Sequence, residues 1–365
     1  MAPEIVHSAS ATRACLARAA IAAAMLASGL PALAADAKHC YRGGDPVACL
    51  VDIARHKLAR VTGADERAGA VGDLLFTLAA TGGDDAALTK EARALAENRS
   101  VGRVRQMDLL YAIDVRESAI APPAKDSYVA ALGRFARLER ELAGDELVEL
   151  YFNACAIIDW DDPFRERWLD FAESVCTSER LKSVKADGEL AKARLLAIMP
   201  IAMTLAEDRA GFARSTGEAM DWLRSAQAAA AKSRDAGRKD LVASVGVLMH
   251  AINSACLDAF DEPEASDAEV DRALRSLRRI EGRRGISGRT TALRRRAVES
   301  LFDTGRDAEA ARLLERMLSR IDADPEGRTI PLAEQISILL LAARLEHYVD
   351  LEQEQEDAAD GRIRM

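Results

Sequence analysis

Aromatic side chains are scarce in this chain of 365 residues, at 4%, and alternating strand patterns are absent. Glycine and proline are also modest, at 22 and 10 residues. Alanine, leucine, arginine and glutamate dominate instead, and these residues favour helices. With 49% hydrophobic and 30% charged residues, the composition is typical of a folded globular protein rather than a disordered chain. The sequence therefore predicts an all-α fold.

The motifs that commonly mark enzymes and metal sites are missing from the sequence. No G-x-S-x-G, H-E-x-x-H, P-loop or G-x-G-x-x-G pattern occurs. One tight His/Cys grouping exists, and it consists of His39, Cys40, Cys49 and His56. Its spacing lacks the C-x-x-C or H-x3-H pairs that place two zinc ligands on one turn. We therefore expect no catalytic residue, no metal and no cofactor, and we expect that the protein is not an enzyme.

The first 34 residues have the pattern of a bacterial secretory signal peptide. Arg13 and Arg18 supply the positive flank, and the apolar run over residues 19–30 is too short to span a bilayer comfortably. A small-x-small site follows, which predicts cleavage near Ala34/Ala35. The chain has a formal net charge of −9, and the signal would remove one net positive charge. We expect a periplasmic or secreted protein, with no transmembrane segment after cleavage.

Cysteine usage leaves an odd number in the mature chain. Cys15 would leave with the signal, so five of the six cysteines remain. Cys40 and Cys49 flank a turn-rich stretch, and both a disulfide and two free thiols are compatible with the sequence there. The other three lie inside apolar helical patterns, which predicts small core residues with free thiols; these are Cys155, Cys176 and Cys256.

Apolar residues recur at helical spacing between short polar turns along most of the chain. We expect a Cys-containing lead-in at 35–46, a helical-repeat array at 47–348, and a disordered acidic tail at 349–365. Short connections between helices predict antiparallel neighbours. The expected helices cover residues 47–60, 66–81, 84–97, 101–116, 124–142, 145–160, 163–180, 187–207, 208–234, 238–258, 266–281, 287–303, 306–321 and 330–348.

Weak internal repetition accompanies the helices. The sequence DLLF at residues 73–76 recurs 35 residues later as DLLY at 108–111, with a looser echo, ELYF, at 149–152. A helix-pair period near 35 residues is typical of tetratricopeptide repeats. Such pairs bury their apolar faces only by stacking on their neighbours.

Two stretches resemble the tetratricopeptide family, which places a glycine at the turn and an alanine in the following helix. The family's early tryptophan and closing proline are not in register in either stretch. The resemblance implies a superhelical solenoid of antiparallel helix pairs that binds peptides on a concave surface; a non-repeating helical bundle is the alternative. The matching residues are Leu301, Gly305, Ala310, Leu314 and Met317 in one stretch, and Val71, Leu74, Leu78, Gly82, Ala87 and Ala94 in the other.

A strongly basic stretch runs over residues 272–296, with ten arginines against Glu281 alone. The positive charge suggests a site for an anionic partner. Alternatively, the acidic tail offsets this charge, or the arginines form a solvated helix face. Interleaved aromatic residues are absent and the chain is acidic, so we expect no nucleic-acid partner. The candidate residues are Arg278, Arg279, Arg283, Arg284, Arg294, Arg295 and Arg296.

The sequence as a whole predicts an exported scaffold that binds a peptide or protein partner on a helical-repeat surface. One alternative is an enzyme or enzyme accessory on a superhelical scaffold that acts on a cell-envelope polymer. Another is a self-assembling structural protein. The sequence does not identify the partner.

Overall fold

The computed structural model describes residues 37–42, 44–83, 85–120, 126–156, 171–284 and 288–359. Within these residues the protein contains fourteen α-helices and no strand, so the predicted all-α fold is confirmed. A short 3-10 helix, η1 (Ala37–Arg42), precedes the first α-helix. The expected signal peptide and its cleavage site lie outside the described residues.

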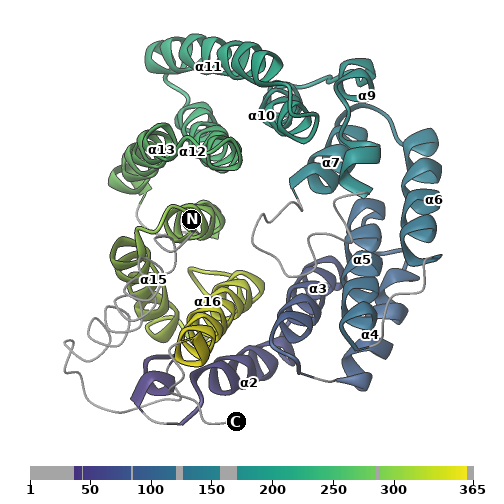
Figure 1. Ribbon diagram of the computed structural model, residues 1–365, viewed down its shortest axis with the longest axis vertical. Coiled ribbons are helices and arrows are strands. Elements are labelled where there is room, and N and C mark those ends of the chain that lie inside the picture. The colour runs from purple at the N-terminus through teal and green to yellow at the C-terminus, as the bar shows by residue number, and fades with distance from the viewer. Residues whose placement is uncertain are drawn as a thin grey trace, which may run out of the picture.

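Successive helices alternate between an inner and an outer position around a common centre (Figure 1). The inner helices are α3 (Ala64–Ala80), α5 (Arg103–Ile120), α7 (Gly144–Ala156), α10 (Glu189–Leu205), α12 (Ala236–Ala259), α14 (Gly288–Asp303) and α16 (Leu332–Ala359). The outer helices are α2 (Pro46–Leu58), α4 (Ala86–Ala96), α6 (Asp126–Glu141), α9 (Ser178–Ser183), α11 (Arg209–Lys232), α13 (Pro263–Arg284) and α15 (Asp307–Asp322). Most outer helices pack beside both neighbouring inner helices, whereas the short α9 packs against α10.

The array closes on itself, a feature that the repeat pattern did not predict. The last helix, α16, packs against both α2 and α3 at the start of the chain. The ammonium of Lys57 on α2 donates a 2.7 Å hydrogen bond to the buried side chain of Gln335 on α16. The helices therefore form a closed ring around one central region (Figure 1).

Local sequence signals set the helix ends. Asp45 precedes α2, and its carboxylate accepts a hydrogen bond from the backbone N–H of Ala48 at 3.1 Å. Asp85 caps α4 in the same way. Gly82 and Gly305 adopt left-handed backbone conformations (φ +71° and +68°) at the turns after α3 and α14, where other residues would be strained.

The structure corrects three details of the sequence interpretation. Ala87 and Ala94, which match the family's pattern in sequence, are exposed, and α4 packs through Leu88, Ala92 and Leu95 instead. The helix expected over 163–180 does not run through its end, because Thr177 caps a separate helix, α9. Residues 349–359, expected in a disordered tail, continue α16, since Glu, Gln and Ala there favour helix.

One helix in the described part of the chain, α12, is long and apolar enough to cross a membrane by length and composition alone. Of its apolar window, 67% is buried inside the protein. A core helix passes the same test, and α12 belongs to the inner set that α10, α11, α13 and α14 cover.

Candidate functional site

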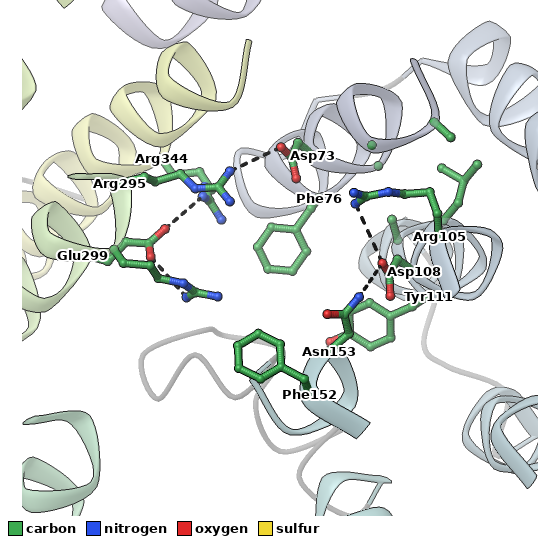
Figure 2. Close-up of a pocket in the computed structure, with 16 residues that line it drawn as sticks. Asp73, Phe76, Arg105, Asp108, Tyr111, Phe152, Asn153, Arg295, Glu299 and Arg344 are labelled. Atoms are coloured by element: carbon green, nitrogen blue, oxygen red, sulfur yellow. Dashed lines mark hydrogen bonds and ion pairs between the residues drawn. The ribbon is translucent and has the colours of Figure 1, made fainter. Parts of the chain in front are cut away.

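A cavity of about 270 Å³ opens on the inner surface where five inner helices converge. Ala68, Gly69 and Gly72 on α3 line the cavity without bulky side chains, and the two glycines face α5, which leaves room beside the helix contact. We call this cavity the central pocket. The polar and aromatic residues that line it are Asp73, Phe76, Arg105, Asp108, Tyr111, Phe152, Asn153, Arg295, Arg296, Glu299 and Arg344 (Figure 2).

At one side of the central pocket Asp73 joins three inner helices. Its carboxylate lies 3.5 Å from a guanidinium nitrogen of Arg295 on α14 and accepts a hydrogen bond from the hydroxyl of Ser337 on α16. Burial alone would lower the pKa of Arg295, but the neighbouring carboxylates, with Asp73 foremost, raise it above its usual value. Burial also raises the pKa of the carboxyl of Glu334, which lies on α16 three residues before Ser337, although Arg295 lowers this pKa.

Asp108 on α5 occupies the opposite side. The amide of Asn153 on α7 donates a 2.9 Å hydrogen bond to its Oδ2, and Arg105 lies 3.8 Å from the same oxygen. Its other oxygen, Oδ1, is buried without a hydrogen-bond partner. Burial raises the pKa of the Asp108 carboxyl to about 6, although Arg105 and Asn153 lower it. A carboxyl with so high a pKa gains and loses its proton near neutral pH.

Glu299 on α14 is shared between two arginines. One of its oxygens lies 3.2 Å from Arg296, and the other lies 4.0 Å from Arg344 on α16. The Arg344 guanidinium also stacks 5.3 Å from the ring centre of Phe76 on α3. The rings of Phe76 and Phe152 both point into the space between Glu299 on one side and Asp108 on the other (Figure 2).

The predicted basic stretch does not form one surface. Arg278 and Arg279 are exposed on the outer helix α13, and Arg283 and Arg284 are its last residues. Arg294 is buried, at 4% exposure. Arg295 and Arg296 line the central pocket instead. Because the chain turns between α13 and α14, neighbouring arginines in sequence end on opposite sides of the helical layer.

Arg278 also borders a second, outer cavity of about 450 Å³ between α13 and α15. Its floor is formed by buried leucines such as Leu277 and Leu313, and Arg312 and Arg316 lie at its edge. These three arginines are exposed side chains on a wide surface. The central pocket brings more charged groups together, so it is the stronger candidate site.

Sequence reasoning missed most of the central pocket, although one signal pointed to it. The repeated segments DLLF at 73–76 and DLLY at 108–111 place their first and fourth residues in the pocket. Phe152, the last residue of the looser echo, lies there as well. The two leucines of the first segment, Leu74 and Leu75, are fully buried. The repetition therefore marks a conserved geometry of pocket-facing positions on three successive inner helices.

Two disulfides are present among the described residues. Cys40 joins Cys49, and this bond ties η1 to α2. Cys155 joins Cys176, whereas we expected both to be free core residues, so that expectation is wrong. The expected turn near residue 161 would have kept them apart, but their Cα atoms are 5.6 Å apart; the connecting residues 157–170 lie outside the described part. Cys256 is a free, buried thiol, as expected.

The described residues contain no group of three or more His, Cys, Asp or Glu side chains arranged to hold a metal ion. The two cysteines of the His39–His56 grouping are bonded to each other, so their sulfurs are not free thiolate ligands. No family model matches the chain, and no curated protein or solved structure matches it either. The geometry of the central pocket is therefore the feature of the molecule from which a function can be inferred.

Proposed function

We propose that this protein is an exported binding scaffold that holds a segment of a partner polypeptide against the inner surface of its helical ring. The observation that carries the proposal is the central pocket, where polar and aromatic side chains from five inner helices converge. Ligand sites are concave and combine an apolar lining with a few convergent polar groups. Because α16 closes the ring against α2 and α3, an extended segment suits this surface better than a folded domain.

The alternation of inner and outer helices supports the interpretation as a solenoid of antiparallel, tetratricopeptide-like helix pairs. In such arrays one helix of each pair lines the concave surface. Two disulfides support the proposed periplasmic or secreted location, because disulfides persist in oxidising compartments. Sequencing the N-terminus of the protein from cells tests export, and we expect it to begin near Ala35. An intact Met1 on cytoplasmic protein would contradict it.

Site-specific photocrosslinking in cells tests the binding surface. A photoreactive p-benzoylphenylalanine replaces Phe152, which points into the central pocket, or Arg224, which is exposed on the outer helix α11. We expect adducts with a polypeptide from position 152 and none from position 224. Adducts from position 224 alone, or from neither position, would contradict binding on the inner surface.

An enzyme acting on a cell-envelope polymer is a second candidate, and one observation favours it. Asp108, with its pKa raised to about 6, lies in the same pocket as Asp73. Two carboxyl groups in different environments can divide the roles of acid and base between them. Incubating the mature protein with purified peptidoglycan, and measuring released reducing ends, tests this candidate. Activity that Asp108→Asn abolishes would favour the enzyme over the scaffold.

A further inference from the structure

Among the residues that the structure describes, the charged side chains that line the central pocket are unequal in number: four are arginines and three are carboxylates. The imbalance lies at Glu299, because this single carboxylate faces both Arg296 and Arg344, at 3.2 and 4.0 Å. Neither distance is that of a tight bidentate pair, which brings N and O to about 2.7–2.9 Å. Two guanidiniums are therefore held close together with one incompletely shared counter-charge.

We propose that the central pocket binds a ligand that carries a carboxylate on an apolar or aromatic body. The carboxylate binds between Arg296 and Arg344, in place of Glu299, and the body lies between the rings of Phe76 and Phe152. This inference rests on the proposed function, since it names the chemistry of the group that the inner surface receives. It assigns Arg296 and Arg344 as the anchoring residues.

Glu299 itself shows that the two guanidiniums accept a planar carboxylate between them. Guanidinium groups present paired donors that match both oxygens of a carboxylate. The Arg296 side chain is 43% exposed, so an incoming anion can reach it from the pocket. Arg344 is more covered, at 18%, and its position over Phe76 fixes the direction of its donors.

The apolar part of the ligand is defined by the two phenylalanines. The guanidinium of Arg344 lies 5.3 Å from the ring centre of Phe76, which is on α3. The guanidinium of Arg194 lies 5.5 Å from the ring centre of Phe152, which is on α7. Each ring is thus held by a cation beside it, and both rings point into the cavity (Figure 2). A cavity of about 270 Å³ is large enough for one ring-sized group, not for a folded element.

Three matched probes test this chemistry by isothermal titration calorimetry with the mature protein. Phenylacetate carries both the ring and the carboxylate, phenylacetamide lacks the charge, and acetate lacks the ring. We expect phenylacetate to bind at least about tenfold more tightly than either of the others, since one charge-assisted contact is worth about that factor. Equal binding of phenylacetate and phenylacetamide would overturn the proposal.

Variants separate an anchoring role from a structural one. Arg296→Gln should abolish phenylacetate binding, whereas Arg316→Gln, on the outer helix α15, should leave it unchanged. Glu299→Gln should instead increase the affinity several-fold, because it removes the charge that competes with the ligand. A gain of affinity cannot come from misfolding. Weaker binding by Glu299→Gln would overturn the proposal.

The carboxylate could belong to a free small molecule or to the C-terminus of the partner. The dipeptide N-acetyl-Ala-Phe, with a free carboxylate or as the amide, distinguishes these sources. Binding of the free acid but not the amide indicates a chain terminus, and binding of phenylacetate alone indicates a small molecule. Failure of every probe, with crosslinks still formed at position 152, would overturn this inference and leave the scaffold. Phenylacetate binding without such crosslinks would overturn the scaffold and leave this inference.

Discussion

The Nζ of Lys57 and the Oε1 of Gln335 lie 2.7 Å apart, although 278 residues separate them in sequence. Gln335 is fully buried, and its amide also donates to the backbone oxygens of Asp324 and Ile330. Burial lowers the pKa of Lys57, and Arg60 lowers it further. One amide thus joins α2, α16 and the turn before α16 at the point where the ring closes.

Removing that amide should open the closure. Gln335→Ala leaves the Lys57 ammonium and two backbone oxygens without their partner, and an unsatisfied buried group costs about 1–3 kcal/mol. We expect a loss of at least that size in urea denaturation. Gln106→Ala, which removes one local bond to the backbone oxygen of Asn98, is the matched control and should cost less. Equal losses would show that the contact does not hold the ring closed.

The disulfides differ in the length of chain that they close. Cys155 and Cys176 are 21 residues apart, and Cys40 and Cys49 are 9 apart. In the chain-entropy model, Cys155→Ala should lower the unfolding free energy by about 3 kcal/mol and Cys40→Ala by about 2.5 kcal/mol. Non-reducing peptide mapping should find both pairs.

Iodoacetamide should not label native Cys256, because burial raises the pKa of its thiol to about 12. Native labelling of Cys155 would contradict the pairing.

Helical periodicity predicted the helices well because it depends on local spacing. It did not predict the central pocket, because the pocket depends on contacts between distant parts of the chain. Asp73 and Arg295 meet across 222 residues, and only the closure of the ring brings them together. The repeated DLLF and DLLY segments each begin with an aspartate, Asp73 or Asp108, that lies on the inner surface. Nothing in them indicated that α14 and α16 would supply the arginines.

The end of the helix expected over 163–180 was wrong for a local reason. The sequence interpretation ran one helix through residues 171–180, whereas Cys176 and Thr177 lie outside helix. Thr177 ends that helix and caps the next one, since its hydroxyl accepts a hydrogen bond from the backbone N–H of Arg180 at 3.4 Å. A threonine inside an apolar pattern is a weak signal, because threonine also occurs within helices.

Gly72 lines the central pocket inside α3, where glycine weakens a helix. A Cβ there would lie 3.7 Å from Leu109 and 4.0 Å from Ala112, which are ordinary contacts. Gly72→Ala should therefore raise the unfolding free energy by about 0.5–1 kcal/mol. Gly211→Ala should have the opposite sign, because its Cβ would collide with Asp208, the cap of α11, and with Met203. Thermal denaturation measures both; destabilisation by Gly72→Ala would show that α3 and α5 pack more tightly than described.

Asp108 should make the protein less stable as the pH rises. Its carboxyl has a pKa of about 6 in the fold and about 3.9 in the unfolded chain, so between these values the folded state binds more protons. Burial is the largest cause of the raised pKa; Arg105 and Asn153 lower the pKa, whereas Glu149 and Asp73 raise it. The stability that depends on the protonated carboxyl is fully present below about pH 4, and it is lost as the pH rises from about 4 through about 6.

Asp108→Asn tests this linkage, since asparagine keeps the shape and can still accept a hydrogen bond from Asn153. The variant should be more stable than the wild type by up to about 2–3 kcal/mol at pH 7, and the difference should vanish near pH 4. Urea denaturation at the two pH values measures it. Asp221→Asn, at an exposed pair with Arg224, is the control and should change stability by less than about 1 kcal/mol at either pH. If Asp108→Asn has the same effect at both pH values, the carboxyl does not titrate near 6, and the pocket stores no charge-linked destabilisation that a ligand could relieve.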